Sequence, residues 1–168
     1  MHPPEPAAAS PQPPAPFEDG TLFGHPIALA RLFGLRGEQI GDNRARVRLP
    51  HRPDFSNSRG DVHGGALSAL FDSVLACAVR AHEPLRWGVV TVDLSVHYLA
   101  SCRGDVVAEA RCDQRGRSLC FARGEAYDDS GRLLATATGT FKLVERQPDP
   151  DPDPTPSPFP STPDRPSP

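Results

Sequence analysis

The segment from Ala66 to Ala81 constrains the fold more than any other part of the chain. It consists almost wholly of apolar or small residues, and Asp72 is its one carboxylate. A helix that is apolar on nearly every side must be buried, so the remaining elements have to surround it. A charged group in such a helix is costly unless it is paired or used. The sequence therefore predicts a central buried helix in which Asp72 has a function.

Helical spacing gathers the small and polar residues of this segment on one narrow face. Gly65, Ser68, Asp72 and Ala76 follow one another at intervals of three or four residues, hence on one side of a helix. Larger apolar residues cover the other sides: Leu67, Leu70, Phe71, Val74 and Leu75. The narrow face predicts room for a ligand or for a partner helix. The competing interpretation is an ordinary solvent-facing carboxylate.

The start of the helix is the second place where chemistry is expected. Gly64 and Gly65 open it, where unpaired backbone N–H groups and the positive end of the helix dipole could polarise a substrate carbonyl. An ordinary glycine turn preceded by a loop histidine, His63, is the alternative interpretation. Gly64 and Asp72 are eight residues apart, about 12 Å along a helix. If both serve one small reacting centre, Asp72 has to come from a second subunit across a two-fold axis.

The rest of the chain predicts a sheet around this helix. A short helix and one strand precede it, at Pro26 to Phe33 and Arg44 to Leu49. Four strands follow it, at Val89 to Leu99, Asp105 to Cys112, Ser118 to Tyr127 and Leu133 to Leu143. This order predicts an α+β fold in which a curved antiparallel sheet wraps one long central helix.

Alternation in the strand from Val89 to Leu99 predicts which side chains share a face. One face is expected to carry Val90, Val92, Leu94, Val96 and Tyr98. The other face is expected to carry Thr91, Asp93, Ser95 and His97.

Composition separates two tails from the folded part. Most of the 21 prolines lie in the first sixteen or the last twenty-one residues, where they block both helix and sheet. We expect disordered tails at residues 1–19 and 146–168 and one domain at residues 20–145. The tails are expected to be solvated, and a proline-motif ligand is the minority interpretation.

Charge and cysteine usage exclude several classes of function. The net charge is −3 without a basic block, so nucleic-acid binding is not expected. No apolar run approaches the ~20 residues that cross a bilayer, and no signal-peptide pattern is seen, which predicts a cytoplasmic protein without membrane partners. The four cysteines lack metal-ligand spacing and are expected to be packed, reduced thiols without a bound metal: Cys77, Cys102, Cys112 and Cys120.

The sequence His63-Gly64-Gly65, placed between Asn57 and Asp72, resembles the hotdog-fold acyl-CoA thioesterases of the phenylacetate-pathway (PaaI) type. The segment from Val90 to Tyr98 is similar to that family's second strand, and Gly116-Arg117-Ser118 to its hairpin near the nucleotide end of coenzyme A. The resemblance covers about Gly20 to Leu143. It implies two subunits that pair edge to edge, as a dimer or a dimer of dimers, and hydrolysis of an acyl-CoA thioester without any cofactor beyond the coenzyme A of the substrate.

The resemblance also implies roles for individual residues. The Gly64 N–H would polarise the thioester carbonyl, while His63 and Asn57 would hold the thioester and the water. Asp72 of the partner would act as general base or nucleophile, with Thr91 orienting the water. Further substrate contacts are expected on the narrow helix face and, for the phosphates, at turns: Gly65, Ser68, Arg103, Arg115, Arg117 and Ser118.

Two other functions compete with hydrolysis. A non-catalytic acyl-CoA-binding hotdog protein would keep the pocket for sensing, yet it would have no need for a carboxylate at the thioester. A hotdog hydratase or dehydratase would rely on a differently placed pair of Asp and His or of His and Glu, which the sequence does not show. Asp72 therefore favours the thioesterase.

Overall fold

The computed structural model describes residues 21–146, so the tails predicted at residues 1–19 and 146–168 lie outside the described part, apart from Arg146. The elements in chain order are α1 (Ala28–Phe33), β1 (Arg36–Gly41), β2 (Arg44–Leu49), η1 (Pro53–Phe55), α2 (Gly64–Arg80), β3 (Trp87–Tyr98), β4 (Val106–Arg115), β5 (Cys120–Asp128) and β6 (Leu133–Glu145). The predicted α+β class is confirmed.

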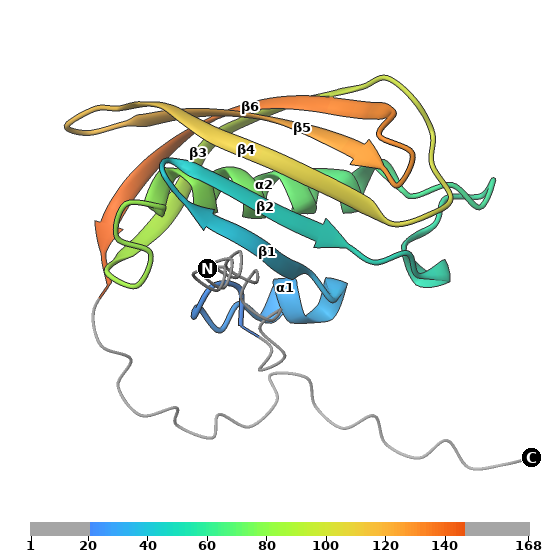
Figure 1. The fold of residues 1–168 in the computed structure, drawn as a ribbon, viewed down its shortest axis with the longest axis horizontal. Coiled ribbons are helices and arrows are strands. Elements are labelled where there is room, and N and C mark those ends of the chain that lie inside the picture. Colours follow the sequence, from blue (N-terminus) through green and yellow to red (C-terminus); the bar gives the residue numbers. More distant parts are fainter. Residues whose placement is uncertain (1–20, 147–168) are drawn as a thin grey trace, which may run out of the picture.

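One antiparallel sheet wraps the long helix. Its six strands lie in the order β1-β2-β4-β5-β6-β3, and every neighbouring pair is antiparallel. Figure 1 shows α2 running beneath β4, β5 and β6, with β1 and β2 curving around its side. The predicted hotdog architecture, a curved sheet around one central helix, is therefore confirmed. Each end of the sheet is an edge strand, β1 on one side and β3 on the other.

The core forms between α2 and the inner face of the sheet. Leu70, Phe71, Val74 and Leu75 of α2 are fully buried, as is Phe141 of β6. Burying one such side chain contributes about 1.5–3 kcal/mol, so these contacts fix α2 inside the sheet. Within residues 21–146, no helix is both long enough and apolar enough to cross a membrane.

The strand β1 was not predicted from the sequence. Its residues, Arg-Gly-Glu-Gln-Ile-Gly, are mostly polar and include two glycines, so they lack the alternation of a half-buried strand. The hairpin to β2 turns at Asp42 and Asn43, whose φ angles are +49° and +61°. Positive φ at both turn positions is typical of a two-residue hairpin, and Asp-Asn is a suitable pair for it. This turn is the signal that could have revealed β1.

A β-bulge at Val92 overturns the predicted face assignment of β3. Thr91 pairs with Phe141 and Asp93 with Thr140, so Val92 is an extra residue that has no partner on β6. The extra residue breaks the alternation at that point. Thr91 therefore faces α2 together with Leu94, Val96 and Tyr98, while Val90 and Val92 are 50% and 57% exposed. The prediction that Val90 and Val92 share a face with the later residues was wrong.

All four cysteines are free thiols, as expected. Cys77, Cys102 and Cys120 are buried, and Cys112 is partly so. Burial raises the pKa of the Cys77 thiol, which keeps it in its neutral form. These residues serve as small apolar packing groups.

Candidate active site

His63 organises the start of α2. It is the N-cap residue, with extended backbone angles, and its Nδ1 accepts a hydrogen bond of 2.9 Å from the Gly65 N–H. A neutral ring that accepts at Nδ1 carries its proton on Nε2. The carbonyl of His63 accepts from the Ala66 N–H at 2.9 Å. The structure thus gives His63 a capping role, which does not test the predicted role in holding the thioester.

Capping leaves Gly64 as the free donor at the helix start. No hydrogen bond among the described residues uses the Gly64 N–H, whereas the N–H groups of Gly65 and Ala66 both have partners. The first N–H groups of a helix have no partner within it, and the positive end of the helix dipole adds to their attraction for an acceptor. A ligand carbonyl at this point would find one aimed donor.

Tyr98 lies over the same spot and was missed as a site residue. Its hydroxyl donates to the Gly64 carbonyl at 3.1 Å and shares a 2.6 Å hydrogen bond with the Ser68 hydroxyl. A Cβ added at Gly64 would lie 3.4 Å from the Tyr98 ring. The alternation placed Tyr98 on the same face as Leu94 and Val96, but nothing in the pattern indicated that it meets the start of α2. Its ring forms one wall beside the Gly64 donor.

Asp72 is held from β3. The Thr91 hydroxyl donates to Asp72 Oδ1 at 2.7 Å, and no other hydrogen bond or ion pair of the described part involves Asp72. The carboxylate is half-buried, as are Ser68 and Ala76, while Gly65 is exposed. The predicted narrow face of α2 is thus open in a single chain, and Oδ2 of Asp72 is available on it.

Within one chain the two reactive features stay apart. Gly64 is the first residue of α2 and Asp72 lies eight residues further along, a separation of about 12 Å along the axis. Ser68 and the Tyr98 hydroxyl lie between them. One chain therefore presents two half-sites on the side of α2 that faces β3.

Asn57 contacts its own loop. Its Oδ1 accepts from the N–H groups of Arg59 at 2.8 Å and Asp61 at 3.2 Å, and its N–H donates to the Asp61 carbonyl. Asparagine side chains commonly close loops in this way. The Val62 N–H then donates to the Cys102 carbonyl, which fixes the chain just before His63. A role of Asn57 in binding the thioester stays a prediction.

Asp61 anchors this loop through charge. Its buried carboxylate accepts from Arg103 Nε at 3.0 Å and from Arg59 Nε at 3.2 Å, while Arg103 Nη2 donates to the Arg59 carbonyl. The Arg103 hydrogen bond, and after it the one from Arg59, lowers the pKa of Asp61. Arg103, expected to contact a phosphate, is therefore engaged in holding the loop.

The lowered pKa of Asp61 predicts acid sensitivity of the loop. A carboxyl whose pKa is lower in the folded than in the unfolded chain stabilises the fold at pH values above its unfolded pKa, about 3.9. This stabilisation is lost as the pH falls through the pKa of the folded chain. We expect the melting temperature of Asp61→Asn to lie below that of wild type at pH 7. The difference between the two melting temperatures should disappear as the pH falls below about 4. Thermal unfolding of both proteins from pH 3 to 8 measures this. A gap of equal size at pH 3 and pH 7 would contradict it.

The other predicted phosphate contacts lie at the far end of α2. Arg115 Nη2 donates to the Val79 carbonyl at 2.8 Å and to Asn43 Oδ1 at 2.9 Å, so it caps the end of the helix. Gly64 and Val79 are separated by about 22 Å of helix. Arg117 and Ser118 are exposed in the β4–β5 hairpin. One chain therefore does not bring the predicted set together.

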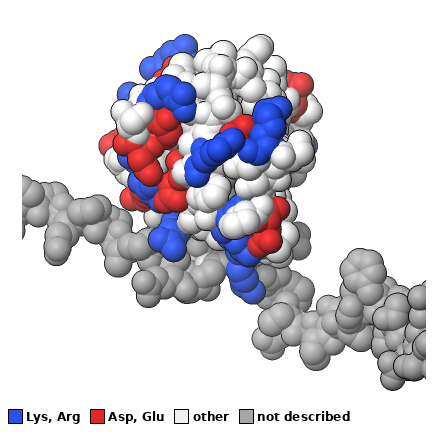
Figure 2. Space-filling view, turned by 90° about the vertical axis from the view of Figure 1, so that its right-hand side faces the viewer, with Lys and Arg blue, Asp and Glu red and all other residues white. Residues whose placement is uncertain are grey.

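The surface at the start of α2 carries both signs of charge. Figure 2 looks onto this end of the molecule and shows basic and acidic side chains next to one another, without a continuous block of either. Local pairs of opposite charge include those of Asp61 with Arg59 and Arg103 and that of Asp128 with Arg132. Hydrogen bonds from Ser130 and Arg132 lower the pKa of Asp128 to about 2. Local pairing of this kind gives no extended basic surface for a polyanion.

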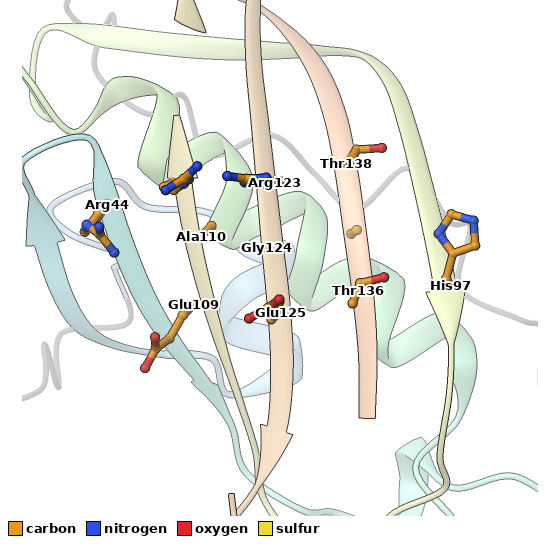
Figure 3. A pocket seen from close by; sticks show the side chains of 11 residues that line it. Arg44, His97, Glu109, Ala110, Arg123, Gly124, Glu125, Thr136 and Thr138 are labelled. Atoms are coloured by element: carbon orange, nitrogen blue, oxygen red, sulfur yellow. The ribbon is translucent and has the colours of Figure 1, made fainter. Parts of the chain in front are cut away.

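A hollow lies elsewhere, on the side of the sheet that faces away from α2 (Figure 3). It measures about 490 Å³, and its lining includes none of the predicted site residues. No group of three or more His, Cys, Asp or Glu residues in the described part could hold a metal ion. The candidate site is therefore an open helix face and not a closed cavity of one chain.

Known proteins are similar to this chain in sequence and in architecture. The family model described as "Thioesterase superfamily" matches residues 59–135, which include the start of α2 and Asp72. A protein of Halobacterium salinarum named "Putative esterase" is 30% identical over 126 residues, which cover 68% of this chain and 83% of that protein.

Two solved structures are also similar to this chain in fold and sequence. A conserved protein of Pseudomonas aeruginosa is 30% identical with a TM-score of 0.67 and coverage of 70% of this chain and 94% of that one. A protein of Ralstonia eutropha JMP134, named "putative thioesterase, phenylacetic acid degradation-related protein", is 31% identical with a TM-score of 0.63 and coverage of 70% and 89%. The helix-in-sheet fold, the family match and these relatives together show that the chain belongs to the thioesterase superfamily.

Proposed function

We propose that this protein hydrolyses acyl-CoA thioesters to the free acid and coenzyme A, as a PaaI-type thioesterase. The observation that carries the proposal is the pair of half-sites on α2, a free Gly64 N–H and a Thr91-held Asp72 on the same open face. Each can act on a thioester, and neither can reach the other's position in one chain. The Ralstonia eutropha relative, whose name refers to phenylacetic acid degradation, supports the substrate class.

The edge strand β3 offers the way to join the half-sites. Its outer edge has no strand neighbour in the described part, and exposed Val90 and Val92 lie along it. Unpaired edges with apolar side chains favour pairing with another strand. On the side that faces α2, Thr91 of β3 is hydrogen-bonded to Asp72 and Tyr98 of β3 is hydrogen-bonded to Gly64.

Antiparallel pairing of β3 with its own copy would complete the site. If the two-fold axis passes near Leu94 and Ser95, Tyr98 of one subunit lies across from the partner's Thr91. Tyr98 is hydrogen-bonded to Gly64, and Thr91 is hydrogen-bonded to Asp72. The Gly64 N–H would then lie next to the partner's Asp72. Two-fold symmetry produces two such sites per dimer.

The chemistry follows from these positions. The Gly64 N–H donates to the thioester oxygen, where negative charge develops as the carbonyl carbon is attacked. The partner's Asp72 serves as general base for water or as nucleophile, and in both cases the C–S bond breaks with release of the thiolate. Among the arginines proposed for the phosphates, Arg117 has no hydrogen bond or ion pair within residues 21–146, so its donors are free for that contact.

Subunit complementation tests the shared site. We expect Asp72→Asn and Gly64→Pro to be inactive separately, and a purified heterodimer of the two to regain about half of the wild-type activity, because one of its two sites is intact. Differently tagged chains are co-expressed, purified through both tags and assayed by thiol release. A short-chain, a medium-chain and an aryl acyl-CoA serve as substrates.

The outcomes separate the parts of the proposal. A heterodimer as inactive as its parents would contradict the shared site, while a wild type that releases no thiol from any acyl-CoA would contradict hydrolysis itself. In the second case, saturable binding of the same acyl-CoAs would favour the non-catalytic binding protein. A heterodimer of wild type and Asp72→Asn, expected to be half active, is the matched control for tagging and co-expression.

A further inference from the structure

The start of α2 has little rigidity of its own. Gly64 and Gly65 are its first two residues, and glycine has more backbone freedom than any other residue. A donor to a developing oxyanion acts only from a fixed position, within about 0.5 Å and 10–20° of the productive geometry. The Gly64 N–H therefore needs support from groups around it.

The peptide group between Gly64 and Gly65 is held at both of its edges. On one edge, the Gly65 N–H donates to His63 Nδ1 at 2.9 Å. On the other edge, the Gly64 carbonyl accepts from the Tyr98 hydroxyl at 3.1 Å. The preceding peptide group is held by the His63 carbonyl, which accepts from the Ala66 N–H. Because peptide groups are planar, fixing these two also fixes the backbone angles of Gly64 and the direction of its N–H.

Tyr98 brings its part of this support from the sheet. It belongs to β3, and its ring lies against the Gly64 backbone, where an added Cβ would be 3.4 Å from it. The Tyr98 side chain is 52% exposed, so burial alone does not hold it. Its position depends on its hydrogen bonds.

Ser68 holds the Tyr98 hydroxyl in turn. The two hydroxyl oxygens are 2.6 Å apart. A phenol has a single O–H, and because Tyr98 donates it to the Gly64 carbonyl, Ser68 is the donor between the two hydroxyls. Hydrogen bonds that follow one another in this way strengthen each other. Ser68, Tyr98 and Gly64 thus form one chain of hydrogen bonds at the first turn of α2.

We propose that Tyr98 is a positioning residue for the reaction. Its hydroxyl, held by Ser68, fixes Gly64 so that the Gly64 N–H points at the thioester oxygen. The inference rests on the proposed hydrolysis and goes beyond it by naming the group that sets the donor. Tyr98 acts through Gly64, since its single O–H is already donated and none is left for the substrate.

One strand would then align both half-sites. Thr91 of β3 holds Asp72, and Tyr98 of β3 holds Gly64. Thr91 and Tyr98 are seven positions apart, a spacing that places side chains on opposite faces of a regular strand. The bulge at Val92 supplies the extra residue that lets both side chains face α2. The bulge therefore has a consequence for the site as well as for the sheet.

Tyr98→Phe tests the proposal, because it removes the hydroxyl and keeps the ring. We expect kcat for acyl-CoA hydrolysis to fall about 10-fold, the effect of one lost hydrogen bond. KM should change little, since the loss falls on the transition state. Tyr127→Phe is the matched control: it removes the other tyrosine hydroxyl of the chain, which donates to Glu125, and should keep the wild-type kcat. A wild-type kcat in Tyr98→Phe would overturn the proposal.

A double-mutant cycle with Gly64→Pro separates positioning from other roles of Tyr98. Proline has no N–H to position, so Tyr98→Phe should cause no further loss of kcat in that background. Ser68→Ala should cause a smaller loss than Tyr98→Phe, and this loss should also vanish in Gly64→Pro. Equal losses in both backgrounds would overturn the proposal, because Tyr98 would then act on the substrate or on the fold and not through the donor.

Amide hydrogen exchange gives a measurement that does not depend on hydrolysis. In isotope-labelled protein, the Gly65 N–H should exchange faster in Tyr98→Phe than in wild type or Tyr127→Phe, because its peptide group has lost one of its two contacts. Unchanged exchange would overturn the hold of Tyr98 on Gly64. A wild type that releases no thiol from any acyl-CoA would contradict the proposed hydrolysis instead, and the exchange rates would then decide alone whether Tyr98 holds Gly64.

Discussion

Replacing Asp72 with asparagine is expected to lower kcat for acyl-CoA hydrolysis by about 10² to 10⁴-fold, the usual contribution of a positioned general base. Asparagine keeps the size of the side chain and an oxygen that can accept the Thr91 hydrogen bond, so the open face of α2 stays as it is. It cannot take a proton from water or attack a carbonyl. KM is therefore expected to change little, since the loss falls on the transition state.

The measurement is steady-state thiol release with purified protein. Asp42→Asn is the matched control, because Asp42 is an exposed carboxylate in the β1–β2 turn, and asparagine tolerates its φ of +49°. We expect that variant to hydrolyse at the wild-type rate. Unchanged turnover in Asp72→Asn would remove Asp72 from the mechanism.

Replacing Gly64 with proline is expected to lower kcat by about 10² to 10³-fold, the cost of losing one donor to a developing oxyanion. Proline removes the N–H that no residue of the described part uses. It suits the first position of a helix, and His63 before it already has the extended angles, φ −66° and ψ 139°, that a residue preceding proline adopts. The substitution should thus delete the donor and keep α2.

Gly64→Ala is the control for the added carbon atoms. Its Cβ would contact the Tyr98 ring at 3.4 Å, as the proline Cβ also would, but the N–H remains. We expect alanine to retain most of the activity, with far-UV circular dichroism identical in both variants. If alanine and proline lose activity equally, crowding against Tyr98 and not the donor is responsible.

The sequence predicted the centre of the molecule well. The apolar run before and after Asp72 required a buried helix, and α2 is buried except on one side, which carries the predicted narrow face together with the partly buried Ala69 and Ser73. The strand from Arg44 to Leu49 was predicted with its correct bounds, because its alternation is unbroken. The spacing of apolar residues along a segment indicates which of its faces is buried. Both α2 and the strand from Arg44 to Leu49 have a clear buried face, so both could be predicted.

Features that depend on distant partners escaped the sequence. The polar strand β1 exists because β2 pairs with it, and Val92 is a bulge because Thr91 and Asp93 follow the register of β6. Arg115 caps α2 because the end of that helix lies beside its hairpin, a contact that the sequence did not predict, while its expected contact with a phosphate stays a prediction. Which groups meet in space follows from the way the sheet curves around α2 and not from spacing along the chain.

The bulge at Val92 also limits how this chain can vary. It allows Thr91, before it, and Leu94, after it, to face α2 although an odd number of steps separates them. Many side chains could replace Val92 itself, because it is exposed and has no partner on β6. Loss of Val92 would leave two steps between Thr91 and Leu94, so regular alternation would keep both side chains on the face towards α2. Loss of one residue elsewhere in β3 would instead turn the side chains on one side of the gap to the opposite face. A change of length is therefore tolerated at the bulge and not beside it.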